Sequence, residues 1–231
     1  MYFVRKINCK VHRVLKKKFR LQKARKKGLK YVPPNFIYFP QQLSKNSIVI
    51  DGGCSYEADF SLHMIKNYGL KAYGVDPTRK HKNSLNLLVK KHKGRFTYLP
   101  FAINAIDGTL MFHESKTNES GSLLKDHTNV KQDKIINYKI KAISLKSLLK
   151  YINIKQIEIL KLDLEGAEYD LLNKISKEEV LPFRQIFVEF HHHAIDHYNK
   201  SDTLRIVKRI CNLGFNNFSL DDHNYLFYKI N

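Results

Sequence analysis

The sequence lacks the features that would place a protein outside the cell or across a membrane. It has no tryptophan and only three cysteines, without a CxxC pair or metal-ligand spacing: Cys9, Cys54 and Cys211. Such scattered cysteines are typical of reduced thiols in a cytosolic protein. No stretch approaches the roughly 18 uninterrupted apolar residues of a membrane-spanning helix, and no secretory signal begins the chain. We expect a cytoplasmic protein whose 231 residues form one domain with an extension.

Acidic residues are absent from the first 50 positions, which hold 14 of the 41 lysines and arginines. From residue 51 onward, 27 basic residues face 21 acidic ones, so most of the net charge of +20 belongs to the N-terminal segment. Apolar residues recur there at helical spacing: Val4, Ile7, Val11, Val14, Leu15 and Phe19. The pattern predicts a basic amphipathic helix that ends near Gly28 and a proline-containing connector. We assign residues 1–40 to these elements and residues 41–231 to the main domain.

Three roles are open for the basic helix. It can dock on the main domain, lie on an anionic membrane surface through residues 1–30, or contact nucleic acid. An apolar stripe would have little use on RNA. Docking is therefore favoured first, and a peripheral position at the inner face of the membrane second.

From residue 47 onward, short apolar runs alternate with helical patterns. Strands are expected at 47–50, 71–75, 95–102, 109–113, 138–143, 157–162, 185–190, 217–220 and 225–230. Helices are expected at 59–68, 80–91, 145–151, 167–174 and 202–213, with a polar loop at 114–134. This alternation predicts an α/β fold with a doubly wound, mostly parallel, seven-stranded Rossmann-like sheet and an antiparallel C-terminal hairpin.

A nucleoside-binding pattern follows the first two strands. Glycines let a backbone turn tightly against a ligand, and a carboxylate after the second strand can accept both hydroxyl hydrogens of a ribose. The loop lacks the G-x-G-x-x-G of dinucleotide sites, and Glu57 would repel a pyrophosphate. The phosphate-free sulfonium cofactor S-adenosyl-L-methionine is therefore favoured over a nicotinamide cofactor. The residues expected at this site are Asp51, Gly52, Gly53, Cys54, Asp76 and Pro77.

The run Lys161–Glu168 is an apolar strand end that becomes acidic and turns into a helix at Gly166. Strand alternation places Lys161, Asp163 and Glu165 on one side, where the lysine would neutralise Asp163 or another nearby carboxylate. The next strand ends in Glu189 and His191. In a parallel sheet these two strand ends would be neighbours at the ligand-binding edge.

Methyl transfer to a hydroxyl acceptor needs a general base that takes the hydroxyl proton. We expect His191 to be this base, with Asp163 or Glu189 orienting it. For Glu168, a functional role and a role in offsetting the helix dipole are both open. Asp163, Glu165 and His191 are of types that ligate metals, but their spacing does not require a metal and none is expected.

Four pieces of the chain together resemble the FkbM family of S-adenosylmethionine-dependent methyltransferases: 49–53, 74–77, 161–168 and 188–191. The resemblance covers about residues 47–189 and implies the class I methyltransferase fold. It also implies that Asp51 and Gly53 flank the methionine part of the cofactor and that Asp76 holds the ribose. We expect Asp163 and Glu165 beside the cofactor as well. Glu57 departs from the later glycine of the family's loop.

FkbM relatives are associated with O-methylation of natural products and sugars. The resemblance therefore implies methylation of a hydroxyl on a glycan or small-molecule acceptor. The alternative is a basic RNA-binding protein, or an RNA methyltransferase with the same fold. The sequence has no RNA-recognition signature, and few aromatic residues stand among the N-terminal charges, so the first interpretation is favoured.

Overall fold

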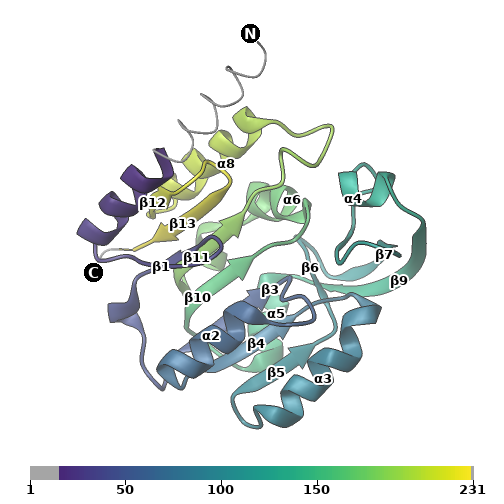
Figure 1. The fold of residues 1–231 in the computed structure, drawn as a ribbon, viewed down its shortest axis with the longest axis horizontal. Coiled ribbons are helices and arrows are strands. Elements are labelled where there is room, and N and C mark those ends of the chain that lie inside the picture. Colours follow the sequence, from purple (N-terminus) through teal and green to yellow (C-terminus); the bar gives the residue numbers. More distant parts are fainter. Residues whose placement is uncertain (1–15, 230–231) are drawn as a thin grey trace.

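A seven-stranded sheet forms the centre of the computed structural model, which describes residues 16–229 (Figure 1). Its strand order is β12–β13–β11–β10–β3–β4–β5. The five parallel strands are β3 (Ile48–Gly52), β4 (Lys71–Val75), β5 (Phe96–Leu99), β10 (Ile157–Leu162) and β11 (Phe183–Glu189). An antiparallel hairpin joins them at β11 and consists of β12 (Asn216–Ser219) and β13 (Asn224–Tyr228). The predicted doubly wound, mostly parallel sheet with its C-terminal hairpin is confirmed.

Helices cover both faces of this sheet because alternate residues of each strand point to opposite sides. Ile50 and Leu160 belong to a buried cluster on one face, and Val49 and Ile159 to a cluster on the other. The first face packs against α5 (Leu145–Ile152), α6 (Ala167–Lys174) and α8 (Lys200–Asn212). The second face packs against α2 (Asp59–Tyr68) and α3 (Lys82–Lys91). The result is a three-layer α/β/α arrangement.

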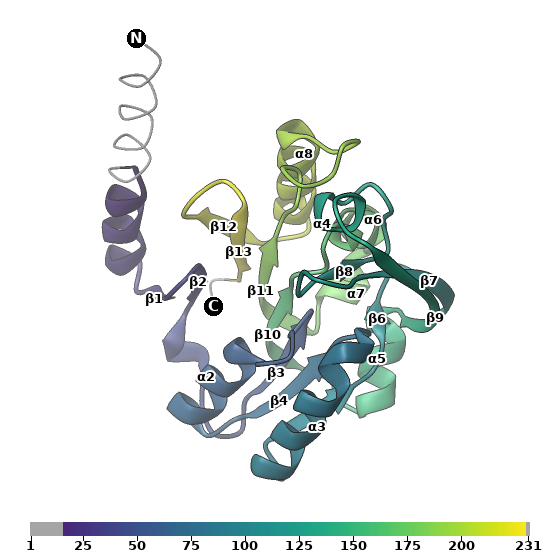
Figure 2. The ribbon, with the colours of Figure 1, turned by 45° about the vertical axis from the view of Figure 1, so that its right-hand side comes forward.

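A second, four-stranded sheet was not predicted. It has the order β6–β9–β7–β8 and stands away from the β12–β13 hairpin, at the right-hand edge of Figure 2. Its strands are β6 (Ala102–Ile103), β7 (Gly108–Ser115), β8 (Gly121–Ser122) and β9 (Ile135–Ile143). The single strand predicted at 95–102 is divided between the two sheets on either side of Pro100, which has no N–H to donate to a ladder.

Short elements account for the rest of the described chain. The predicted polar loop at 114–134 contains β8 and the one-turn helix α4 (Thr128–Lys131), and a further short helix, α7 (Lys177–Val180), was not predicted. Two 3₁₀ turns are η1 (Pro40–Gln42) and η2 (Arg79–His81). The predicted connector forms a small hairpin of β1 (Lys30–Val32) and β2 (Phe36–Tyr38).

Residues 16–26 are helical and dock on the domain beside the C-terminal hairpin (Figure 1). Leu21 and the fully buried Ala24 pack in one cluster with Phe218, and Arg20 pairs with Asp222 at 2.7 Å. Docking is therefore the role of this described part. Positions 1–15 of the predicted helix lie outside the described residues, so a role on a membrane stays a prediction. Within residues 16–229, no helix combines the length and apolarity needed to cross a membrane.

Candidate active site

A cavity lies where β3, β4 and β10 end. Its volume is about 830 Å³ when the open mouth is counted. Apolar wall comes from the segment around β6, and polar wall from the turns after the three strands and from the loop before β8. Residues that line it include Gly53, Asp76, Pro77, Phe101, Asp163 and Glu165. Open α/β sheets bind ligands at this edge.

Asp76 faces the cavity, and backbone groups hold both of its carboxylate oxygens. Oδ2 accepts a hydrogen bond from the Ser55 N–H at 2.9 Å, and Oδ1 accepts one from the Thr78 N–H at 2.8 Å. Burial raises the pKa of Asp76, but the hydrogen bond and charge of His81 and the hydrogen bonds of Thr78 outweigh it and keep the pKa below its usual value. The carboxylate is therefore ionised and faces the cavity as a hydrogen-bond acceptor.

Asp51, by contrast, has no exposed surface. Its Oδ2 accepts hydrogen bonds from the N–H and Oγ of Ser61, at 3.2 and 2.8 Å, in the first turn of α2. Its Oδ1 lies 3.1 Å from Lys161 Nζ, which is 3.5 Å from Asp163 and donates to the Gly53 carbonyl at 3.0 Å. Asp51 thus anchors α2 and neutralises the buried lysine beneath the loop.

Gly53 allows the loop to pass close to the end of β10. Its φ is +71°, and a Cβ added there would lie 1.8 Å from the carbonyl oxygen of Asp163. At Gly52 a Cβ would meet Ile103 at 2.8 Å. Gly53 lines the cavity, whereas Gly52 and the buried Cys54 support the turn without reaching it.

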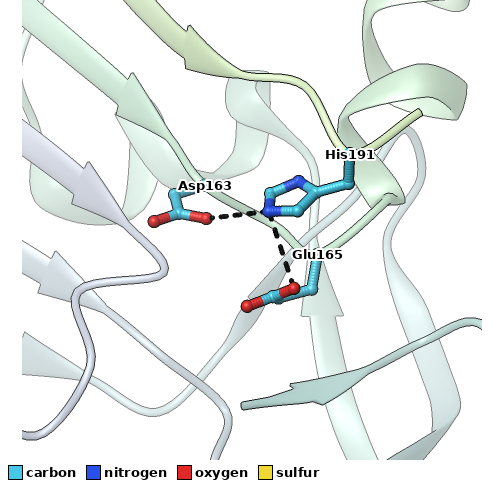
Figure 3. A group of neighbouring side chains, drawn as sticks. All are labelled: Asp163, Glu165 and His191. Carbon is cyan, nitrogen blue, oxygen red and sulfur yellow. Dashed lines mark ion pairs between the residues drawn. The ribbon is translucent and has the colours of Figure 1, made fainter. Parts of the chain in front are cut away.

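Three ionisable side chains meet at the ends of β10 and β11 (Figure 3). Parallel pairing of these strands brings Asp163 and Glu165 beside His191, as the sequence predicts. His191 Nε2 lies 3.5 Å from Asp163 Oδ1 and 3.5 Å from Glu165 Oε2. The imidazole is 7% exposed, while the two carboxylates are 28% and 23% exposed and line the cavity. Glu189 is half-buried and does not line the cavity.

Glu168 fixes the orientation of His191. Its fully buried Oε1 accepts hydrogen bonds from both the backbone N–H and Nδ1 of the histidine, each at 3.0 Å. Its Oε2 accepts the N–H of Gly166 at 2.9 Å. The carboxylate therefore positions the imidazole and also ties down the glycine that precedes α6.

His127 is a site residue that sequence reasoning missed. It precedes α4, is 1% exposed, and places Nε2 2.8 Å from Glu165 Oε2. An isolated bridge between His127 and Ile195 brings this segment to the site. A lone histidine in a polar loop gives no signal of such a long-range contact.

The carboxylates around His191 control its charge. Burial lowers the pKa of His191, but Glu168, Glu165 and Asp163 outweigh this effect and raise the pKa to about 10. Burial raises the pKa of Asp163 despite the positive charges beside it. Burial and the charge of Asp163 raise the pKa of Glu189 to about 7. In the protein alone, His191 is therefore an imidazolium at neutral pH, and Asp163 is a stronger base than an exposed aspartate.

Residues 51–216 match the model of the methyltransferase FkbM domain. The chain therefore belongs to the FkbM family of S-adenosylmethionine-dependent methyltransferases, and its cofactor is S-adenosyl-L-methionine. No curated protein matches the sequence.

Among solved structures, a proposed rRNA methylase from Clostridium thermocellum matches 82% of this chain over 89% of its own, at 12% identity and a TM-score of 0.50. Methanococcus jannaschii fibrillarin, a pre-rRNA processing protein, matches 87% of this chain over 70% of its own, at 10% identity and a TM-score of 0.48. At 12% identity the likeness to the Clostridium protein concerns the fold alone, which is that of class I methyltransferases.

The cavity suits this cofactor. Asp76 presents an ionised carboxylate of the kind that accepts ribose hydroxyls, and Phe101 and Ile103 form an apolar wall of the kind that packs against a base. The absence of a Cβ at Gly53 lets the loop backbone lie close to the end of β10, in space that a Cβ would fill. Asp163 and Glu165 stand at the same cavity, where negative charge complements a sulfonium and an amino group.

Proposed function

We propose that this enzyme transfers the methyl group to a hydroxyl oxygen of a glycan or small-molecule acceptor. One observation carries the proposal: two carboxylates, Asp163 and Glu165, line the same cavity as Asp76. An acceptor hydroxyl must lose its proton as the new oxygen–carbon bond forms. Proton-accepting groups beside the methyl donor support such an acceptor.

Within this proposal each residue has a separate task. When bound, S-adenosylmethionine supplies a methyl group on a sulfonium sulfur. Attack by the acceptor oxygen would form the oxygen–carbon bond and leave the electron pair of the broken carbon–sulfur bond on the sulfur. Asp163 takes the hydroxyl proton, because its raised pKa makes it the better base at the cavity. As an imidazolium, His191 cannot accept a proton, so it holds Asp163 and Glu165 in place instead.

Cofactor binding is divided between direct and supporting residues. We assign direct contacts to Gly53, Asp76 and Pro77, which line the cavity. Asp51, Gly52 and Cys54 act beneath them by holding the loop. Alignment of donor and acceptor supplies the main catalytic effect, which reaches about 7–11 kcal/mol in favourable cases.

Methyl transfer from isotope-labelled donor to three sets of acceptors tests the proposal: sugars and other hydroxyl compounds, amines, and RNA. We expect labelled methyl ethers with an acceptor of the first set. Asp163→Asn should lower kcat by about 10²-fold to 10⁴-fold, while the affinity for S-adenosylhomocysteine changes little. Asp107→Asn, at a separate surface cavity, is the matched control and should leave kcat unchanged. Label found only on RNA or on nitrogen would overturn the proposal.

A further inference from the structure

The spacing of the donor atoms around His191 is wider than that of direct ion pairs. Charge-assisted N–H···O bonds measure about 2.7–2.9 Å, yet His191 Nε2 stands 3.5 Å from each of two carboxylate oxygens. One donor atom from each of Asp163, Glu165 and His191 lies within 4.8 Å of the other two. Ligands at about 2.1 Å in tetrahedral array around a common ion lie about 3.4 Å apart. The distances from His191 Nε2 to the two carboxylate oxygens thus match the spacing of ligands around one ion, and Figure 3 shows the three side chains converging.

The groups behind these donors are arranged as in metal sites. Histidine ligands donate their second ring N–H to a carboxylate or carbonyl, which fixes the tautomer. His191 Nδ1 donates to the fully buried carboxylate of Glu168 at 3.0 Å, so Nε2 points into the gap. In the protein alone, Nε2 carries a hydrogen that faces two carboxylate oxygens, and a bound cation would take the place of that hydrogen.

His127 gives independent support from another segment. Its Nδ1 accepts the N–H of Asn129 at 3.3 Å, which leaves the hydrogen on Nε2. That Nε2 lies 2.8 Å from Glu165 Oε2, yet it makes no well-directed hydrogen bond to any residue from 16 to 229 and its side chain is 2% exposed. A buried N–H beside Glu165 restricts that carboxylate, as the groups behind ligating carboxylates do in metal sites.

Charge balance also favours a cation. Lys161 is shared between Asp51 and Asp163. His191 lies within 3.5 Å of the carboxyls of Asp163, Glu165 and Glu168. A divalent cation beside these carboxyls would offset more of their negative charge than one imidazolium does.

We propose that Asp163, Glu165 and His191 bind one divalent cation of the Mn²⁺ class, with open coordination positions toward the cavity. Mixed carboxylate and imidazole ligands suit first-row transition ions. The site deepens the proposed function and its mechanistic part rests on it: a coordinated acceptor hydroxyl is more acidic than a free one. Asp163 would ligate through Oδ1, the atom that faces His191.

Titration of the metal-stripped full-length protein with Mn²⁺, followed by the electron paramagnetic resonance signal of the free ion, tests the site. We expect one Mn²⁺ per chain. Glu165→Gln and His191→Ala should each weaken binding by at least tenfold, and Glu168→Gln by about 10–100-fold through the ligand it orients. His193→Ala is the matched control: its ring stands 6.0 Å from that of His191 but supplies no ligand, so affinity should stay within twofold.

Circular dichroism checks that each variant is folded. If His191→Ala does not fold, Glu165→Gln and Asp163→Asn still decide the matter, because both side chains are partly exposed. Absence of saturable Mn²⁺ binding, or equal affinity in these variants, would overturn the site. A Mn²⁺ site in a protein that does not bind S-adenosylhomocysteine would overturn the proposed function alone. Hydroxyl methylation without a Mn²⁺ site would overturn the metal site alone.

Discussion

Replacing Asp51 by asparagine separates stability from cofactor binding. The carboxylate is the nearest charge to Lys161, whose side chain is 4% exposed. In the variant the ammonium keeps the Gly53 carbonyl at 3.0 Å and Asp163 at 3.5 Å. Removing one partner of a buried ion pair costs about 3–5 kcal/mol. Because two contacts remain, we expect Asp51→Asn to lower the free energy of unfolding by about 3 kcal/mol, less than the stability of a typical domain.

The effect should not depend on pH over the working range. Burial lowers the pKa of Lys161, but the charges of Asp51 and Asp163 outweigh it and hold the pKa above its usual value. A lysine whose folded pKa is raised contributes stability that is complete below the unfolded pKa of about 10.4 and is lost only as pH rises through the folded pKa. The difference between wild type and variant should therefore be constant between about pH 6 and pH 9.

Urea unfolding of wild type, Asp51→Asn, Lys161→Met and the double variant measures this energy. Removing both charges should recover about 1–4 kcal/mol relative to either single change. Titration calorimetry with S-adenosylhomocysteine, on folded protein, should show that Asp51→Asn changes affinity by less than about threefold, since the carboxylate does not reach the cavity. A loss of stability below about 1 kcal/mol would refute the buried-pair reasoning. A large loss of affinity would show that Asp51 contributes to cofactor binding.

Asp76→Asn should weaken S-adenosylhomocysteine binding about 100-fold or more in calorimetry, because two charge-assisted ribose bonds of about 1.5–3 kcal/mol each are lost; unchanged affinity would remove the ribose assignment. Gly53→Ala should strongly lower the free energy of unfolding in urea, since its Cβ would lie 1.8 Å from a carbonyl oxygen. Gly94→Ala has a positive φ but open space around the added Cβ, and should lower this free energy by only about 1 kcal/mol. Ala24→Asp should lower Tm by burying a charge between the N-terminal helix and the hairpin, and the exposed Lys26→Asp should not; equal effects would argue against docking.

Much of the main sheet could be predicted because its strands are local and buried. The bounds of β4 and β10, and of α2 and α6, agree with the sequence pattern to the residue. Each is a short apolar run or a 3.6-residue pattern with a clear end, such as Gly69, which adopts a positive φ after α2. Local signals of this kind are sufficient to predict a helix or strand whose ends are determined by residues next to it in the sequence.

The second sheet could not be predicted in the same way. β6 and β8 are two-residue strands, too short to show a period, and they exist because β9 and β7 pair with them. The same long-range pairing determines the candidate site. Glu168 reaches His191 from α6, 23 positions earlier in the sequence, and His127 reaches Glu165 from a loop 38 positions earlier.

Asp51 and Asp76 show why a motif does not determine what its residues contact. Asp51 lies near the end of β3, and Asp76 follows the end of β4. These two strands are neighbours and pair in parallel. Asp51 is still within β3, so its side chain is buried and meets Ser61 and Lys161. Asp76 is one residue past β4, where the chain has left the sheet and the side chain faces the cavity. One position relative to the strand end thus separates a carboxylate that stabilises the loop from one that is available to a ligand.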